Sequence, residues 1–226
     1  MRLKRLSAIC AAPFAIVACL SSASAAVDLN GGVWRPVEPP EALTTLTGAK
    51  PPLRPATLKA AAKIKPPVLS AEVAHAKQCL PPGVPRILLK AAPLEFLQRP
   101  EEIVILYQWN RMARTVQMDI AQPEVIGPAY LGQSVGKWVG DTLRIETIGF
   151  NDATMLDEAG LPHSDQLRVV EEYKVTAPGS MEAIVTITDP KIFTHPWQTR
   201  LRFKHDPAGR ISEDVCLERT SQGDRK

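Results

Sequence analysis

The sequence predicts an all-β protein: an antiparallel meander of about eight strands that closes into a lipocalin-like barrel or folds as a sandwich. After Pro100, apolar and polar residues alternate in short runs that end at turn residues, as they do in half-buried strands. Before it, 13 of the 21 prolines lie between Pro36 and Pro100, where they block helix interiors and strand ladders. We favour closure into a barrel, because an open meander leaves two exposed edges.

Residues 1–25 have the pattern of a signal peptide. A basic start (MRLKR) precedes an apolar run, and Ala23-Ser24-Ala25 fits the small-x-small cleavage rule. The apolar run is too short for a permanent membrane span. Ile16-Val17-Ala18-Cys19 also reads as a lipobox, so lipidation at Cys19 is the alternative to cleavage before Ala26. We expect a periplasmic or secreted protein with no membrane insertion, apart from this alternative lipid anchor.

The charge balance excludes a broad nucleic-acid-binding surface. The formal net charge is +3, but residues 1–25 hold three basic residues and no acid. The remaining chain has 24 basic and 24 acidic residues, so it is neutral overall. Neutral chains lack the basic surface that binds phosphate backbones, and we expect no nucleic-acid partner.

Residues 26–100 are predicted to form a proline-rich arm. TLKAAAKIK (Thr57–Lys65) is typical of a short helix, which Pro66-Pro67 would end. Val33-Trp34 and Leu43–Leu46 are apolar enough that we expect the arm to pack on the folded domain. A disordered linker is the alternative.

The barrel domain is predicted over residues 101–220, with a disordered tail at 221–226. Its strands are joined mainly by short turns, of which Gly140-Asp141 and Pro178-Gly179 are the clearest. The predicted strands are Glu102–Trp109, Met112–Asp119, Gln133–Trp138, Thr142–Ile148, Gln166–Thr176, Met181–Asp189, Trp197–His205 and Arg210–Glu218.

Alternation places three charged side chains on inward faces: Arg114, Glu171 and Glu213. An isolated buried charge is too costly to persist, so we expect Arg114 to contact at least one of the two carboxylates. The two interpretations are a structural ion pair in a closed core and the polar floor of a ligand cavity. For such a cavity the predicted ligand-binding residues are Arg114, Trp109, Trp138, Tyr173, Glu213, Asn151, Asp152 and Asp157.

The segment from Gly149 to Asp165 is the other predicted functional region, because long ordered loops often bind or cover ligands. His163 and Asp165 are two residues apart and would point the same way in an extended segment. His163, with Asp165 or the inward Glu171, could therefore act as a general acid or base. We expect His163 to reach the largest pocket and to bond a carboxylate.

Structural interpretations of this loop stay open. Asn151 and Asp152 more often cap turns than catalyse, and His163 can equally fill a loop. His195, in FTHPW, is interpreted mainly as a loop filler. The four histidines are scattered, so we expect no catalytic zinc, no other metal and no cofactor.

Two cysteines, Cys79 and Cys216, follow the predicted signal peptide. In an oxidising compartment such a pair most simply forms a disulfide. Two free buried thiols, or a metal site, are the alternatives.

Six segments in this order resemble a family of exported bacterial proteins common in sphingomonads and acidobacteria. They are CLPPGVPR, EFLQRP, LGQSVGKWVGDTLRIETIGFND, LPHSDQLRVVEEY, TITDPKIFTHPW and EDVCLER, and the resemblance covers roughly Pro81 to Arg219. It implies family membership and no particular reaction. The positions of the family pattern present here are Arg114, Trp138, Asp141, Asn151, Asp152, Asp157, His163, Ser164, Asp165, Glu171, Asp189, Trp197, Glu213 and Cys216. The string GKWVGDTLRIET also resembles lipocalin-like domains in general.

Three classes of function follow from these features. The first is an exported barrel that binds a small, partly apolar molecule inside it. The second is a cofactor-free hydrolase, lyase or isomerase that uses His163 with a carboxylate. The third is an envelope-associated structural protein that binds a partner through the proline-rich arm. We rank the first highest, because no nucleophile, base and orienting residue form an evident set.

Overall fold

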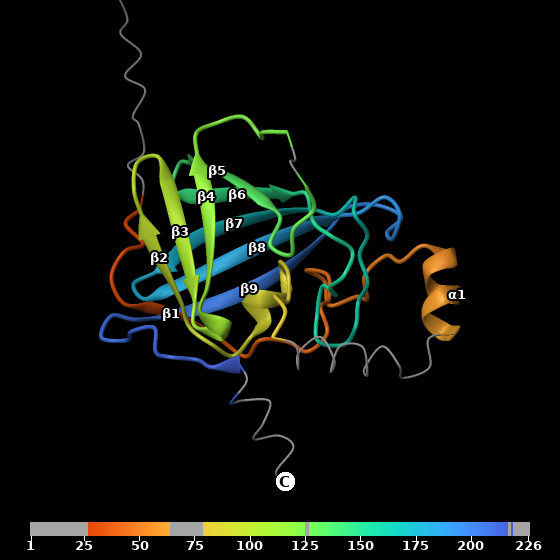
Figure 1. Cartoon of the computed structure of the whole chain (residues 1–226), viewed down its shortest axis with the longest axis horizontal. Helices are drawn as coiled ribbons and strands as arrows, with labels where there is room; N and C mark the ends of the chain where they lie inside the picture. Colours follow the sequence, from red (N-terminus) through yellow and green to blue (C-terminus); the bar gives the residue numbers. More distant parts are fainter. Residues whose placement is uncertain (1–26, 64–78, 125–126, 217, 219–226) are drawn as a thin grey trace, which may run out of the picture.

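Nine strands form one closed barrel in sequence order, which confirms the predicted all-β barrel (Figure 1). The computed structural model describes residues 27–63, 79–124, 127–216 and 218, so the predicted signal peptide and tail lie outside the described residues. None of the described helices is long and apolar enough to cross a membrane. The strands are β1 (Val33–Pro36), β2 (Leu94–Gln98), β3 (Glu102–Tyr107), β4 (Met112–Met118), β5 (Gln133–Val139), β6 (Thr142–Ile148), β7 (Arg168–Ala177), β8 (Ser180–Thr188) and β9 (Trp197–Asp206).

The helical elements of the described chain are short. They are α1 (Pro55–Lys63) and the 3-10 turns η1 (Arg86–Leu89) and η2 (Trp109–Arg111). All four residues of η1 are buried. The arm helix was predicted at Thr57–Lys65 and begins two residues earlier, with Pro55 in its first turn, where proline costs no hydrogen bond. Figure 1 shows α1 standing away from the barrel.

One neighbouring pair departs from the predicted antiparallel meander. β4 and β5 run parallel, with Val116–Met118 beside Ser134–Gly136, whereas every other neighbouring pair is antiparallel. A parallel pair needs a connection that returns to the starting end of the sheet. Residues 119–132 provide it, which explains why this connection is longer than a hairpin turn.

The prediction that the barrel begins after Pro100 is wrong, because the proline-rich arm supplies two of its strands. β1 pairs with β9 through four residues and meets β2 at Trp34, so it closes the barrel. Prolines lie at the ends of these strands (Pro36 ends β1 and Pro93 precedes β2) where a missing donor is tolerated. A Cβ at Gly32 would lie 2.4 Å from the carbonyl oxygen of Asp206, so this closure requires glycine.

The predicted last strand, Arg210–Glu218, is also wrong. Residues 207–215 contain no strand, because β1 occupies the place beside β9. Glu213 therefore does not face inward. Its side chain is exposed, 3.7 Å from Arg111 at the surface.

The predicted disulfide between Cys79 and Cys216 is confirmed, with a sulfur–sulfur distance of 2.01 Å. It joins residues 137 apart in the sequence and ties the chain after β9 to the segment that enters η1. Cross-links that span a long loop restrict the unfolded chain most strongly. A disulfide of this kind is compatible with an oxidising compartment.

The inward faces of β7 and β8 follow the predicted alternation. On β7, Val169, Glu171 and Tyr173 are buried, and on β8 every second residue from Met181 to Ile187 is buried. Met112, Arg114, Val116 and Met118 form the corresponding face of β4. Ile120, which the pattern added to that face, lies beyond β4 and is exposed.

Candidate binding groove

A buried ion pair between Arg114 of β4 and Glu171 of β7 occupies the barrel interior. The Arg114 side chain donates to both carboxylate oxygens of Glu171, at 3.1 and 2.5 Å, and the residues are 3% and 0% exposed. Glu171 also accepts a hydrogen bond from the Tyr173 hydroxyl at 2.7 Å. The predicted contact between Arg114 and an inward carboxylate is therefore confirmed for Glu171.

Hydroxyl groups on β5 and β6 complete this network. Arg114 donates to Ser134 at 2.9 Å and to Thr147 at 2.5 Å, and these two hydroxyls lie 3.1 Å apart. Burial lowers the pKa of Arg114, but the charge of Glu171 and the neighbouring tyrosines more than offset this, so the pKa stands above its usual value. Burial also raises the pKa of Tyr107, beside Arg114, to about 12. The network is charged and closely bonded, as a structural ion pair would be.

His163 is buried in the loop that was predicted to be functional, and it bonds no carboxylate. Its Nδ1–H donates to the carbonyl of Ser164 at 3.0 Å, so Nε2 accepts from the Thr154 hydroxyl at 2.7 Å. The ring packs edge-on against Phe150 at 6.3 Å. Burial lowers the pKa of His163, and the Ser164 carbonyl and the charges of Asp189 and Asp152 only partly oppose this. The prediction of a carboxylate partner that favours the protonated form is wrong, because both ring nitrogens are already bonded.

The structure does not bring the three predicted catalytic residues together. Asp165 is exposed and pairs with Lys191 at 2.6 Å, while Glu171 lies inside the barrel with Arg114. The neighbouring Asn151 accepts a bond from the backbone of Ala153, as in a turn, and Asp152 is exposed. His163 therefore has no acid/base partner in this loop.

Two buried carboxylates connect the loop to the rest of the chain. Asp157 accepts backbone bonds from Leu43 of the arm and from Leu161 of the loop, both at 2.9 Å. Asp189, after β8, accepts bonds from the backbone and the hydroxyl of Ser164, at 2.6 and 2.8 Å. The loop backbone adds two bonds from residues 158 and 159 to the carbonyl of Glu41. The loop thus fixes the arm, and Asp157 has this structural role.

The remaining predicted ligand-binding residues lie at separate places. Lys90 sits over the ring of Trp109, 5.1 Å from its centroid. Trp138 lines a different surface pocket, which Asp28, Gln98 and Met118 also line. With Glu213 exposed elsewhere, the predicted set does not form one site.

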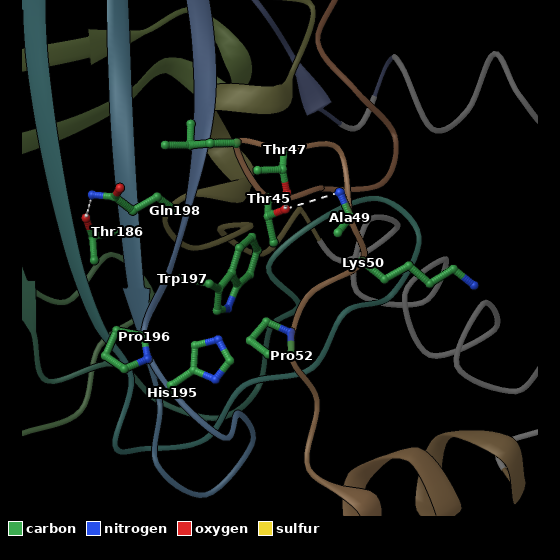
Figure 2. Close-up of a pocket in the computed structure, with 11 residues that line it drawn as sticks. Thr45, Thr47, Ala49, Lys50, Pro52, Thr186, His195, Pro196, Trp197 and Gln198 are labelled. Carbon is green, nitrogen blue, oxygen red and sulfur yellow. Dashed lines mark hydrogen bonds between the residues drawn. The ribbon is translucent and has the colours of Figure 1, made fainter.

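A surface groove lies between the arm and the start of β9, and it is larger than three other pockets that are lined by described residues. Its volume is about 680 Å³, within the usual range for small-molecule sites. Figure 2 shows Trp197 between the arm, with Thr45 and Pro52, and the neighbouring strands. His163 and the interior network do not line it, so the prediction that His163 reaches the largest of these pockets is wrong. The lining residues are Thr45, Leu46, Thr47, Ala49, Lys50, Pro52, Thr186, His195, Pro196, Trp197 and Gln198.

Hydrogen bonds hold the arm side of the groove in place. A tight turn spans Thr45 to Ala49. The backbone N–H of Thr45 donates to the carbonyl of Ala49, and the N–H of Gly48 donates to the carbonyl of Thr45. The N–H of Ala49 donates to the Thr45 hydroxyl. Gly48 adopts a positive φ of 80° in this turn, which glycine accommodates without strain. Further along, Leu53 pairs with Phe193, and the carbonyl of Pro52 accepts bonds from both the backbone and the hydroxyl of Thr194. The groove is therefore formed by ordered chain on both sides.

The floor of the groove contains a buried donor with no partner. Trp197 packs edge-on against Phe193, with ring centroids 5.4 Å apart, and its Nε1 makes no hydrogen bond within the described chain. Figure 2 shows this nitrogen at the ring edge that faces Pro52 and His195. Buried donors are nearly always bonded. The Nε1 of buried Trp34 also has no partner within the described chain, but of these two tryptophans only Trp197 lines the groove, so its donor is the one that a ligand there could satisfy.

Few features of the sequence point to this groove. Leu43–Leu46 was predicted to dock, and His195 and Trp197 were noted within FTHPW, but these segments lie about 150 residues apart. Asp189 appeared only as part of the family pattern. The two segments are joined by backbone hydrogen bonds, and these cannot be predicted from the types of the residues.

Within the described chain, no three His, Cys, Asp or Glu residues lie close enough to hold a metal ion. Comparison with models of protein families finds no match, and neither does comparison with curated proteins. The resemblance to exported proteins of sphingomonads and acidobacteria therefore stays a prediction.

Replacing Glu171 with alanine should lower the free energy of unfolding by about 3–5 kcal/mol, because Arg114 would be left as an uncompensated buried charge. The double variant Arg114→Met/Glu171→Leu should recover a large part of this loss, since it leaves no charge unpaired. Urea unfolding measures both. Equal destabilisation of the single and the double variant would show that packing, and not the pairing of charge, controls stability here.

Acidification should destabilise the fold partly through His163. Its folded-state pKa is lowered below the usual 6.5, so the unfolded chain binds more protons between the two pKa values. The free energy of unfolding should therefore fall as the pH drops below 6.5 and through the folded-state pKa. Urea unfolding of His163→Gln at pH 7.5 and pH 5 should show a smaller fall than the wild type.

His195→Gln is the control for this measurement, since His195 is exposed at the groove. This variant should keep the pH dependence of the wild type. Identical pH dependence in wild type and His163→Gln would refute the assignment of His163 as a buried neutral imidazole.

Proposed function

We propose that this barrel protein binds a small, partly apolar molecule in the outer groove between residues 45–52 and the start of β9. The observation that carries the proposal is the unpaired Nε1–H of buried Trp197 at the floor of an ordered groove. The donor is buried, so a ligand atom that accepts a hydrogen bond would reach it only when the neighbouring Pro52 and His195 move apart. Leu46, Ala49 and Pro196 supply apolar contacts around it.

The groove is a better candidate than the barrel interior. Arg114, Glu171 and Tyr173 are almost fully buried and bond one another, so a ligand there would have to displace a satisfied ion pair. Breaking such a pair is costly. In the outer groove, a ligand would have to move only Pro52 or His195 to reach Trp197 Nε1, and it would break no ion pair.

The enzyme alternative has less support than binding. His163 has both ring nitrogens bonded inside the protein, and Asp165 pairs with Lys191. A general acid or base needs a ring nitrogen or carboxylate that a substrate can reach. We place the partner-binding alternative lower as well, because residues 41–54 of the arm are bonded to the barrel and to its loops.

We further propose that the protein is exported to the periplasm or secreted. The disulfide supports this location, and residues 1–25 have the pattern of a signal peptide. Mass spectrometry of the mature N-terminus would distinguish cleavage before Ala26 from lipidation at Cys19.

Replacing Leu46 with glutamine should weaken binding of a partly apolar probe about fivefold, because Leu46 is 45% exposed and its apolar surface lines the groove. The probe is N-phenyl-1-naphthylamine, whose fluorescence rises when it leaves water. Fluorescence titration gives the dissociation constant.

Leu58→Gln is the matched control, since Leu58 is a leucine of α1 that is 53% exposed and does not line the groove. It should bind the probe like the wild type, and thermal unfolding should show that both variants remain folded. If the probe does not bind, or if both variants weaken its binding alike, the groove is not the binding site.

A further inference from the structure

The groove is lined by one lysine, Lys50, and by no acidic side chain. No carboxylate is among the eleven lining residues, whereas Lys50 carries a positive charge on the arm. Lys50 is exposed and forms no ion pair within the described chain. Most other described lysines have an anionic or hydroxyl partner: Lys90 contacts Glu158, Lys174 contacts Asp141, Lys191 contacts Asp165 and Lys204 contacts Ser180. The ammonium group of Lys50 is therefore available to a ligand.

The opposite side of the groove adds acceptors. The Thr194 hydroxyl donates to the carbonyl of Pro52, so in the neutral ring it accepts from Nδ1–H of His195, which leaves Nε2 as an acceptor. The amide nitrogen of Gln198 donates to Thr186, which leaves its oxygen as an acceptor. Lys50 is the only lysine or arginine among the lining residues.

The positions of these groups separate an apolar part from a charged part. Figure 2 shows Trp197, Pro52 and His195 close together, while the Lys50 side chain extends from the arm away from them. Amphipathic lysine side chains commonly keep the ammonium group in water while the apolar surface below them is covered. A ligand could therefore place its apolar part on the floor and its charged end at the rim.

We propose that the ligand of this groove is an amphipathic anion, with an apolar body against Trp197 and Pro52 and an acidic group paired with Lys50 at the rim. This inference rests on the proposed function and specifies the chemical class of its ligand. A long-chain or aromatic carboxylate belongs to this class. A neutral molecule with the same apolar body would bind without the contribution of Lys50.

Two probes with the same ring system test the proposal: 8-anilinonaphthalene-1-sulfonate, which is an anion, and N-phenyl-1-naphthylamine, which is neutral. In Lys50→Gln the dissociation constant of the anionic probe should rise about two- to fivefold, as expected for an exposed ion pair. The neutral probe should bind as to the wild type. Added salt should weaken the binding of the anionic probe to the wild type, and it should have less effect on binding to Lys50→Gln.

Lys59→Gln is the matched control, since Lys59 is an exposed lysine of α1 outside the groove. Lys59→Gln should bind both probes like the wild type, and Leu46→Gln should weaken the binding of both probes. The inference is overturned if Lys50→Gln leaves the anionic probe unaffected, weakens both probes equally or acts like Lys59→Gln. In those cases the proposed function still stands if the neutral probe binds and Leu46→Gln weakens its binding. If neither probe binds, both proposals are overturned.

Discussion

The buried pair of Arg114 and Glu171 constrains the whole interior of this barrel. A charge inside a barrel must be paired and hydrogen-bonded. Here Ser134 of β5, Thr147 of β6 and Tyr173 of β7 also bond the ion pair. Strands β4, β5, β6 and β7 are thus joined through their side chains as well as through their ladders. The same network occupies the space that a ligand would need inside a lipocalin-like barrel. A binding function is therefore better supported on the outer wall.

The second constraint is the attachment of the arm. β1 closes the barrel beside β9, and the disulfide adds a covalent tie next to η1. Between them, Asp157 bonds the backbone of Leu43, and residues 52–54 bond residues 192–194. In the loop from 149 to 165, Asp157 and Glu158 bond the arm, while Ser164 and Asp165 bond residues that follow β8. The arm then forms one wall of the groove at Trp197, so a structural role for the loop and a binding role for the groove are linked.

Period-two alternation was sufficient to predict the inward faces of β4 and β7, including Arg114 and Glu171, because it depends only on local geometry. It failed at Glu213 and Ile120, where the same pattern occurs beyond the sheet. β1 has four residues, too few for a pattern, and its pairing with β9 depends on distant backbone groups. The hydrogen-bond partners of His163 could not be predicted from its residue type. A carboxylate was expected, but the ring is bonded by a hydroxyl and a backbone carbonyl. The groove could not be predicted, because it exists only where the arm meets β9.

Binding in the groove can be tested most directly with the four tryptophans as reporters. Protein labelled with 5-fluorotryptophan gives fluorine NMR signals for Trp34, Trp109, Trp138 and Trp197, which substitution by phenylalanine assigns. On addition of N-phenyl-1-naphthylamine, the Trp197 signal should shift and saturate while the other three stay in place, because Trp197 alone among them lines the groove. A shift of the Trp34 or Trp138 signal with no change at Trp197 would contradict binding in this groove.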